Sequence, residues 1–335
     1  MKKKQAYLYC YKKDLNDATN YYTNLVESCI IESGYDVNRV YSLKDIKKPD
    51  LIFTITCIGF FKAKVRFPFV KTLNWVQGII YEETKMKGLP KYYQWVLWLF
   101  EAITIWKSDA LLFVSQKMFE YYRLKFKYKK DNYIIMPCYN CKLNDTVSLD
   151  KFNSPSFVYA GGLSKWQSIN EILETYSLVE RQIKNASLTL YCKQNDELIA
   201  TIKKLGIQNF TIKYVSVDVL QQELLQYKYG FLLREANWVN AVSTPTKMNS
   251  YLAGYVIPIF SDAVDDFINN IHLGNSTLMA KTPLSPPKIA EMIIEYEKSF
   301  HEYSDFINNV KIIFNNHYND DTYKTKIKKG INLYF

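Results

Sequence analysis

The stretch Phe157-Val-Tyr-Ala-Gly-Gly-Leu-Ser164 is the clearest indication of the fold. Four apolar residues predict a short strand, two glycines follow, and a helical pattern occupies residues 168–184. Continuous apolar strands separated by helices are typical of a parallel sheet that is covered on both faces. The alternation continues with strands expected at 187–192, 210–214, 229–233 and 256–260, a helix at 196–206, and helices from there to the end of the chain.

Strand and helix patterns alternate in the same way in the residues before this stretch. Strands are expected at 6–10, 36–41, 51–56, 71–76, 110–114 and 133–136, and residues 14–17 begin a helix that stops at Gly34. A polar stretch, residues 141–155, has the composition of a linker. The sequence therefore predicts an α/β protein of two doubly wound, Rossmann-like parallel-sheet domains. Ligands bind at the carboxyl ends of such strands, so we expect a cleft between the domains.

Length and composition agree with two globular domains. The chain has 335 residues, of which 48% are hydrophobic and 23% are charged, with only 11 Gly and 10 Pro. This balance excludes collagen-like, low-complexity and disulfide-scaffold proteins.

The positive charge lies almost entirely in the first half. The net charge is +10, and residues 1–150 hold 24 Lys and Arg against 15 Asp and Glu, whereas residues 151–335 hold 19 against 18. Such a field attracts the phosphates of nucleic acid or of anionic lipid head groups. A solvated surface without a partner explains the charge equally well.

Several chemistries have no residues to support them. The six cysteines lie mostly in apolar runs, as buried thiols in a reducing cytoplasm do, and no signal peptide is expected. Cys138 and Cys141 have metal-site spacing but no second pair. Only three histidines occur, all after residue 270, which disfavours His-based hydrolases and His-rich metal sites. Phosphate-binding loops of the nucleotidase and dinucleotide types are absent from the sequence.

Residues 91–107 are apolar almost all round and contain three tryptophans. The segment is shorter than the roughly 20 apolar residues that span a bilayer. Trp and Tyr favour a membrane interface, and nearby basic residues would add attraction to anionic lipid; these are Lys62, Lys64, Arg66, Lys71, Lys91 and Lys107. A buried core helix is an equal alternative.

The strongest candidate site lies in residues 232–253. The pair Arg234-Glu235 follows a strand, Thr244 is placed to cap the next helix, Pro245 is expected at its first position, and Lys247 lies in its first turn. A cation there is unfavourable beside the helix dipole unless an anion is bound. Arg234, Lys247 and the N–H groups of the helix start predict a diphosphate site. Surface charges around a loop are the alternative.

Residues 245–259, Pro-Thr-Lys-Met-Asn-Ser-Tyr-Leu-Ala-Gly-Tyr-Val-Ile-Pro-Ile, resemble a known segment. It is Pro-x-Lys-x-x-Glu-Tyr-Leu-Ala-x-Gly-x-x-Pro-Ile of GT-B-type glycosyltransferases, specifically the retaining family 4 enzymes of bacterial polysaccharide assembly. Residues 158–167, 232–235, 74–83 and 109–115, with Met136-Pro137, resemble further segments in the same order. The matching segments span residues 74 to 260, and the first 70 residues agree only in pattern.

The resemblance implies a GT-B enzyme that moves a sugar from a nucleotide diphosphate donor, with retention and without a metal or other cofactor. The acceptor would be a glycan or a polyprenyl-linked molecule. Arg234 and Lys247 would neutralise the diphosphate, and Glu235 would lie near the transferred sugar. The implied donor-binding residues are Gly161, Gly162, Lys165, Asn240, Thr246, Ser250 and Tyr251, with Tyr251 near the nucleoside. The implied acceptor-side residues are Gln77, Gly78 and Glu82.

Some residues depart from the family pattern. Ser250 stands where the family has the glutamate that holds the ribose, and Gln77 where many members have a histidine. Gly162 occupies a place often taken by arginine, which Lys165 would have to replace, and Tyr255 replaces a glycine. An inactive, transferase-like binding protein is therefore an alternative.

By the same resemblance, residues 1–150 form an acceptor-side domain facing the membrane, 151–310 a donor domain, and 311–335 a helical segment packing back on the first. The expected location is cytoplasmic and peripheral, on an anionic inner membrane face, in surface polysaccharide synthesis. The alternative from another class is a nucleic-acid-binding protein, because 28 tyrosines with many lysines can stack bases and pair phosphates. No recognised nucleic-acid motif occurs, so nucleic acid is not an expected partner.

Overall fold

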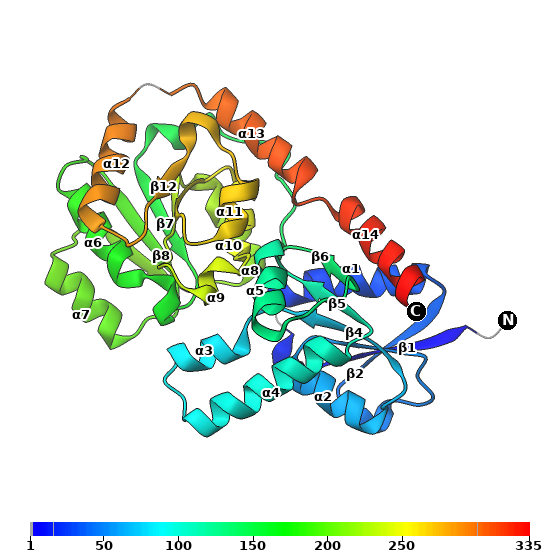
Figure 1. Ribbon diagram of the computed structural model, residues 1–335. Coiled ribbons are helices and arrows are strands. Elements are labelled where there is room, and N and C mark those ends of the chain that lie inside the picture. The colour runs from blue at the N-terminus through cyan, green and yellow to red at the C-terminus, as the bar shows by residue number, and fades with distance from the viewer. Residues whose placement is uncertain (1–2, 16, 300) are drawn as a thin grey trace. The chain divides into compact units, whose positions relative to one another are not determined.

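The computed structural model describes residues 3–15, 17–299 and 301–335, and the chain forms two compact units (Figure 1). Unit 1 contains Met1–Asn140, Val242–Thr244 and Asn319–Phe335. Unit 2 contains Cys141–Ala241 and Pro245–Tyr318. The C-terminal end of the chain therefore belongs to the same unit as its beginning.

Unit 1 is built on a parallel six-stranded sheet of order β2-β1-β3-β4-β5-β6. Every residue of β3 and β5 is buried, as the apolar runs in the sequence predict for strands covered on both faces. The strands are β1 Lys4–Tyr9, β2 Tyr35–Val40, β3 Leu51–Thr54, β4 Lys71–Val76, β5 Ala110–Phe113 and β6 Tyr133–Ile135. The helices are α1 Asp17–Glu32, α2 Cys57–Arg66, α3 Ile80–Met86, α4 Lys91–Lys107, α5 Gln116–Phe126 and α14 Asp320–Tyr334.

The helices of unit 1 cover both faces of its sheet. The connection from β1 to β2 runs across the sheet in the opposite direction to the later connections, so right-handed crossovers place α1 on one face and α2, α4 and α5 on the other. The C-terminal helix α14 packs beside α1. Asp320 at its start accepts hydrogen bonds from the hydroxyls of Tyr21 (3.0 Å) and Tyr139 (2.9 Å), and Lys328 pairs with Glu32 at 2.9 Å.

Unit 2 has a second parallel six-stranded sheet, of order β12-β11-β10-β7-β8-β9. The first five strands of unit 2 along the chain, β7 to β11, lie within two residues of the predicted ones. The expectation that only helices follow residue 260 is wrong, because β12 is a sixth strand. Its three residues are too few for the sequence to show a pattern. The strands are β7 Ser156–Ala160, β8 Ser187–Tyr191, β9 Phe210–Lys213, β10 Tyr229–Leu232, β11 Ile257–Ser261 and β12 Leu278–Ala280. The helices are α6 Ile169–Glu180, α7 Asp196–Leu205, α8 Val217–Glu223, α9 Trp238–Ala241, α10 Thr246–Ala253, α11 Asp265–Asn270, α12 Pro286–Lys298 and α13 Tyr303–Asn316.

The strand order of unit 2 has one reversal, between β7 and β10. From β7 the chain moves outward through β8 and β9, and it then returns to add β10, β11 and β12 on the other side of β7. Connections on the two sides leave in opposite directions, and this opens a crevice at the carboxyl ends of the two central strands. Residues that follow β7 and β10 therefore border the crevice.

The polar stretch expected to be a linker is packed against α10. The backbone N–H of Cys141 donates to the Asn249 side chain (2.7 Å), and that of Asn144 donates to the carbonyl of Ala253 (3.2 Å). Lys151 and Phe152 in the same stretch are buried. Polar composition predicts the lack of regular structure in residues 141–148 but not these contacts, because they use side chains that occur equally often in free loops.

The aromatic segment forms one helix, α4, that is buried on one side only. Leu97, Glu101, Thr104 and Ile105 are buried, whereas Trp95 is 61% exposed. The alternative of a buried core helix therefore holds for one face of α4 only. No helix among the described residues is long and apolar enough to cross a membrane.

Lys151 is a buried cation at the C-terminal end of α10. Its Nζ donates to the carbonyl of Gly254 at 2.6 Å, and it has no ion-pair partner within the described ranges. Burial lowers the pKa of Lys151 to about 7, compared with about 10.4 in an unfolded chain. Between these values the unfolded chain binds more protons than the folded one, so stability rises with pH in this window.

We expect Lys151→Met to flatten this pH dependence. The wild-type melting temperature should rise from pH 7.5 to 9.5 relative to the variant, by the equivalent of about 1 kcal/mol per pH unit. Thermal unfolding followed by circular dichroism across this range measures the difference. Lys142→Met, at an exposed position in the same stretch, is the control and should keep the wild-type slope. Parallel curves for Lys151→Met and wild type would contradict the shifted pKa.

Candidate active site

The carboxyl ends of β7, β10 and β11 bring together three residues that lie far apart in the sequence. Gly161 follows β7, Arg234 follows β10, and Ser261 ends β11. The Ser261 hydroxyl accepts a hydrogen bond from the N–H of Arg234 (2.9 Å) and donates to its carbonyl (2.7 Å). The backbone of Arg234 is thereby fixed at the crevice.

The side chain of Arg234 is buried and extends from the end of β10 to the segment that follows β7. Its Nη1 donates to the carbonyl of Trp166 at 2.6 Å. This bond uses one of the five guanidinium N–H groups, so others remain for a ligand.

Lys247 reaches the same loop from α10. It is the second residue of that helix, and its Nζ donates to Oε1 of Gln167 at 2.7 Å and lies 4.1 Å from the ring centre of Tyr159. Its stem lies directly over Gly161, where an added Cβ would come within 2.5 Å of Nζ. Gly161 has a φ of +146°, which residues with side chains rarely adopt.

The two cations lack a negative counterpart. Among the described residues, no carboxylate lies within ion-pair distance of Arg234 or Lys247. Burial lowers the pKa of Arg234 to about 10. Burial, and then the neighbouring charge of Arg234, lower the pKa of Lys247 well below its usual value. A bound anion would offset both effects, and the start of α10, which no side chain caps, adds its dipole to the attraction.

The expected cap of α10 is wrong by one residue. Pro245 is in the cap position and Thr246 begins the helix. The Thr244 hydroxyl instead accepts a hydrogen bond from the N–H of Cys138 at 2.9 Å, within unit 1. The backbone of Pro245, with ψ of 122°, is not helical, so the helix starts after it and beyond reach of the Thr244 side chain.

Glu235 lies in the loop after β10, and Asn240 lies in the short helix α9 that follows this loop. The amide of buried Asn240 donates to the carbonyl of Glu235 at 2.8 Å, which ties the loop to α9. The Glu235 carboxylate has no hydrogen-bond or ion-pair partner in the described part of the chain. Asn240 therefore shapes the loop, whereas the side chain of Glu235 is left to meet a ligand.

Tyr251 lies beneath the site, which does not agree with the expected contact to a nucleoside. Its ring is fully buried and packs on Gly230. Its hydroxyl accepts from the N–H of Ala160 (3.1 Å) and donates to the carbonyl of Phe231 (3.1 Å). Tyr251 therefore joins β7 to β10 just below the crevice.

The other predicted donor-side residues lie around this set. The half-buried Ser250 donates to the carbonyl of Thr246 at 3.1 Å, so its hydroxyl proton is already used within α10. Gly162 and Lys165 are exposed, and Lys165 lines a separate cavity of about 190 Å³ beside the starts of α6 and α7. Sequence reasoning missed Gln167 and Tyr159, although both lie beside the glycine pair that marks this loop.

Unit 1 has its own cavity, of about 290 Å³, at the carboxyl ends of β3 and β4. Of the predicted acceptor-side residues, Gln77 and Gly78 line this cavity and Glu82 does not. Glu82 instead binds Lys85 (2.9 Å) and the Tyr121 hydroxyl (3.1 Å).

Two other carboxyl groups line this cavity. The Glu83 carboxyl lies against the Cα of Gly78, and burial raises the pKa of Glu83. Burial also raises the pKa of Glu101, although Lys125 binds that carboxylate at 3.0 Å. The sequence places an acidic pair after Gly78, but only the helical turn of α3 decides which of the two faces inward.

Comparison with known proteins shows the fold. No family model and no curated protein matches the sequence. HepE from Anabaena, solved in complex with UDP and glucose, matches with a TM-score of 0.73 and 10% identity over 98% of this chain and 100% of HepE. Sucrose-phosphate synthase from Thermosynechococcus elongatus matches with a TM-score of 0.69 and 11% identity over 98% of each chain. These structures are GT-B glycosyltransferases, and the predicted GT-B fold is confirmed.

We expect Gly161→Ala to weaken nucleoside diphosphate binding by at least about tenfold, because the new Cβ displaces Lys247 and the backbone is strained. Calorimetry with ADP, GDP and UDP in parallel measures the effect. Gly34→Ala in unit 1 is the matched control, since φ at Gly34 is also positive (+94°) but a Cβ there meets no atom within 4 Å. Equal binding by both variants would mean that the position of Lys247 over Gly161 does not matter for the ligand.

Proposed function

We propose that this protein is a glycosyltransferase that uses a UDP-sugar donor and transfers the sugar, with retention and without a metal, to a glycan or polyprenyl-linked acceptor in surface polysaccharide synthesis. The observation that carries the proposal is the pair of buried, uncompensated cations, Arg234 and Lys247, at the strand reversal of a GT-B chain. The UDP preference is taken from the names of the matching structures, which include complexes with UDP and UDP-glucose.

The proposed reaction replaces one bond at the anomeric carbon of the sugar. The bond to the diphosphate oxygen breaks, the acceptor hydroxyl oxygen forms the new bond, and the hydroxyl proton is released. Negative charge develops on the leaving diphosphate, where Arg234, Lys247 and the N–H groups at the start of α10 can stabilise it. Hydrogen-bond donors that are held in place before the reaction need no reorganisation during it. Ser261 holds the backbone of Arg234 in this way, and Gln167 holds the side chain of Lys247.

The cavity of unit 1 suits the acceptor. It presents Gln77, Gly78 and the carboxyl group of Glu83, so it offers both donors and acceptors of hydrogen bonds to a hydroxyl-rich ligand. Its volume of about 290 Å³ is near the lower limit of typical ligand pockets. We assign it to the acceptor rather than to the donor because it contains no cation to meet a diphosphate.

Nucleic-acid binding is a weaker explanation than sugar transfer. Eighteen of the 28 tyrosines are buried, so they cannot stack on bases as the composition suggested. An inactive binding protein with the same fold differs from the proposal only in turnover, and the experiment below separates the two.

We expect Arg234→Ala and Lys247→Ala each to lower the transfer rate by about 10²–10³-fold, because each removes a charge that stabilises the leaving diphosphate. Thermal shift with a set of nucleotide sugars first identifies the donor, since a ligand that binds the folded state raises its melting temperature. Release of the nucleoside diphosphate then measures turnover. Lys203→Ala, on α7, is the control for removing a lysine. Near-normal rates in Arg234→Ala and Lys247→Ala would refute the assignment of these residues to the diphosphate. Binding of the donor by the wild-type protein without release of the nucleoside diphosphate would favour an inactive binding protein.

Donor binding should also depend on pH. Because the pKa of Lys247 is lowered in the free protein, the side chain loses its proton more readily than an ordinary lysine, and the diphosphate restores it. UDP affinity should therefore fall as pH rises above neutrality, with proton uptake on binding. Calorimetry in buffers of different ionisation enthalpy measures that uptake, and Lys247→Arg should reduce it. Binding without proton uptake over the whole range from pH 7 to pH 10 would show that the diphosphate does not change the protonation of Lys247, which would contradict this prediction.

A further inference from the structure

Helix α4 carries a second apolar stripe, on the side that faces away from the sheet. Tyr92, Trp95, Leu99, Ile103 and Trp106 recur every three or four residues, so they share one face of the helix. Tyr92 is 74% exposed and Trp95 is 61% exposed. The core accounts for the buried face of α4 but not for this stripe.

The neighbouring helix α2 extends the apolar surface. The two helices lie side by side (Figure 1). The stacked rings of Phe61 and Phe100, whose centres are 4.4 Å apart, join them. Val65 near the end of α2 is exposed, and Phe69 in the following loop is 98% exposed. Isolated exposed apolar residues are common, but this many on two adjacent helices indicates a partner.

The exposed charged residues on α2 and α4 are all positive. The exposed charged residues of α2 and α4 are Lys62, Arg66, Lys91 and Lys107, and none of them has an ion-pair partner in the parts of the chain that are described. The single acid of the two helices, Glu101, is buried. We call these four residues, together with Val65, Phe69, Tyr92, Trp95 and Trp106, the α2–α4 face.

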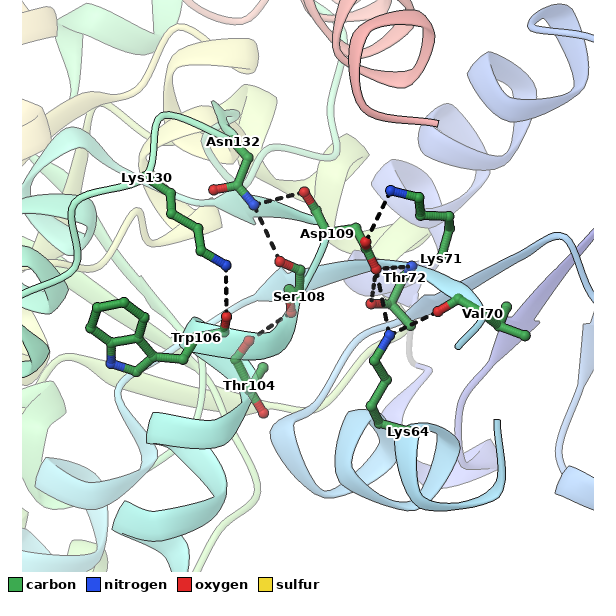
Figure 2. A network of polar contacts seen from close by, with 10 residues as sticks. All are labelled: Lys64, Val70, Lys71, Thr72, Thr104, Trp106, Ser108, Asp109, Lys130 and Asn132. Atoms are coloured by element: carbon green, nitrogen blue, oxygen red, sulfur yellow. Dashed lines mark hydrogen bonds and ion pairs between the residues drawn. The ribbon is translucent and has the colours of Figure 1, made fainter. Parts of the chain in front are cut away.

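A polar network holds this face in place. Figure 2 shows Asp109, just after α4, binding Lys64 of α2 (3.5 Å), Lys71 (3.2 Å) and the backbone N–H of Thr72 (2.9 Å). Lys130 donates to the carbonyl of Trp106 at 2.8 Å. The carboxylate of Asp109 thus partly neutralises Lys64 and Lys71.

We propose that the α2–α4 face binds the surface of an anionic lipid bilayer. Tryptophan and tyrosine rings prefer the head-group region, and unpaired lysine and arginine side chains are attracted to anionic lipids. The absence of exposed carboxylates on the two helices favours a negative surface over a second copy of this face, which would repel it. This binding needs neither donor nor acceptor, so it stands or falls separately from the proposed transfer.

The test is sedimentation of the full chain with vesicles of phosphatidylcholine alone or with about 30% phosphatidylglycerol. We expect tighter binding to the anionic vesicles, weakened by salt. Tyr92→Ser with Trp95→Ser should weaken binding to both vesicle types by at least about tenfold. Lys91→Glu with Lys107→Glu should weaken binding to the anionic vesicles by about fivefold or more per residue, because each Lys near such a surface contributes on the order of 1 kcal/mol.

Matched controls lie in unit 2. Tyr214→Ser removes an aromatic side chain that is 79% exposed, and Lys203→Glu reverses a charge on α7, and both should bind vesicles as wild type does. Lys247→Ala should also bind normally, so loss of donor chemistry does not affect the result. Equal binding by the Tyr92/Trp95 variant and wild type would overturn the proposal. So would lipid-free self-association that this variant abolishes, because a second copy would then cover the face.

Discussion

The feature on which the cation site of unit 2 depends is that Lys247 lies over a residue without a side chain. Its Nζ occupies the space next to Gly161, and the φ of +146° at position 161 favours glycine. The strand reversal brings this glycine beside Arg234, and the Tyr251 hydroxyl joins the two strands just below it. Placing two like charges in a desolvated crevice costs free energy, and the fold opposes that cost with hydrogen bonds to a carbonyl and an amide oxygen rather than with a carboxylate. Neutral acceptors orient the cations and leave their charge available to an anion.

The strand pattern could be predicted because these strands are buried on both faces. A run such as Phe157-Val-Tyr-Ala160 is apolar throughout, and glycine or polar residues limit it at each end. Strand β12 could not be predicted in this way, since three residues carry no period. The same holds for residues 141–155: composition shows that regular structure is largely absent, whereas packing against α10 depends on particular pairs such as Cys141 with Asn249.

The charged residues of the candidate site could be predicted from the sequence, but the burial and direction of its side chains could not. Residue type and helix position identified Arg234 and Lys247, because a cation in the first turn of a helix needs an explanation. Side-chain direction decided the rest. Tyr251 follows Ser250 by one residue, yet it points into the sheet, and Glu82 and Glu83 likewise differ in whether they face the cavity. A one-residue step on a helix rotates the side chain by about 100°, and a motif alone does not tell which way the helix is turned.

The uneven net charge of the sequence has two different explanations in the structure. In unit 2 a few cations matter because they are buried and unpaired, although the charge of residues 151–335 nearly cancels. In unit 1 part of the positive charge is paired internally, because the Asp109 carboxylate after α4 binds Lys64 of α2 and Lys71 of β4. What remains on the outside of α2 and α4 is a set of lysines and an arginine beside exposed aromatic rings. Helix α4 is apolar all round for two reasons, the core on one side and, by our proposal, a lipid surface on the other. Seventeen residues with a buried Glu101 are suited to lying along such a surface and not to crossing it.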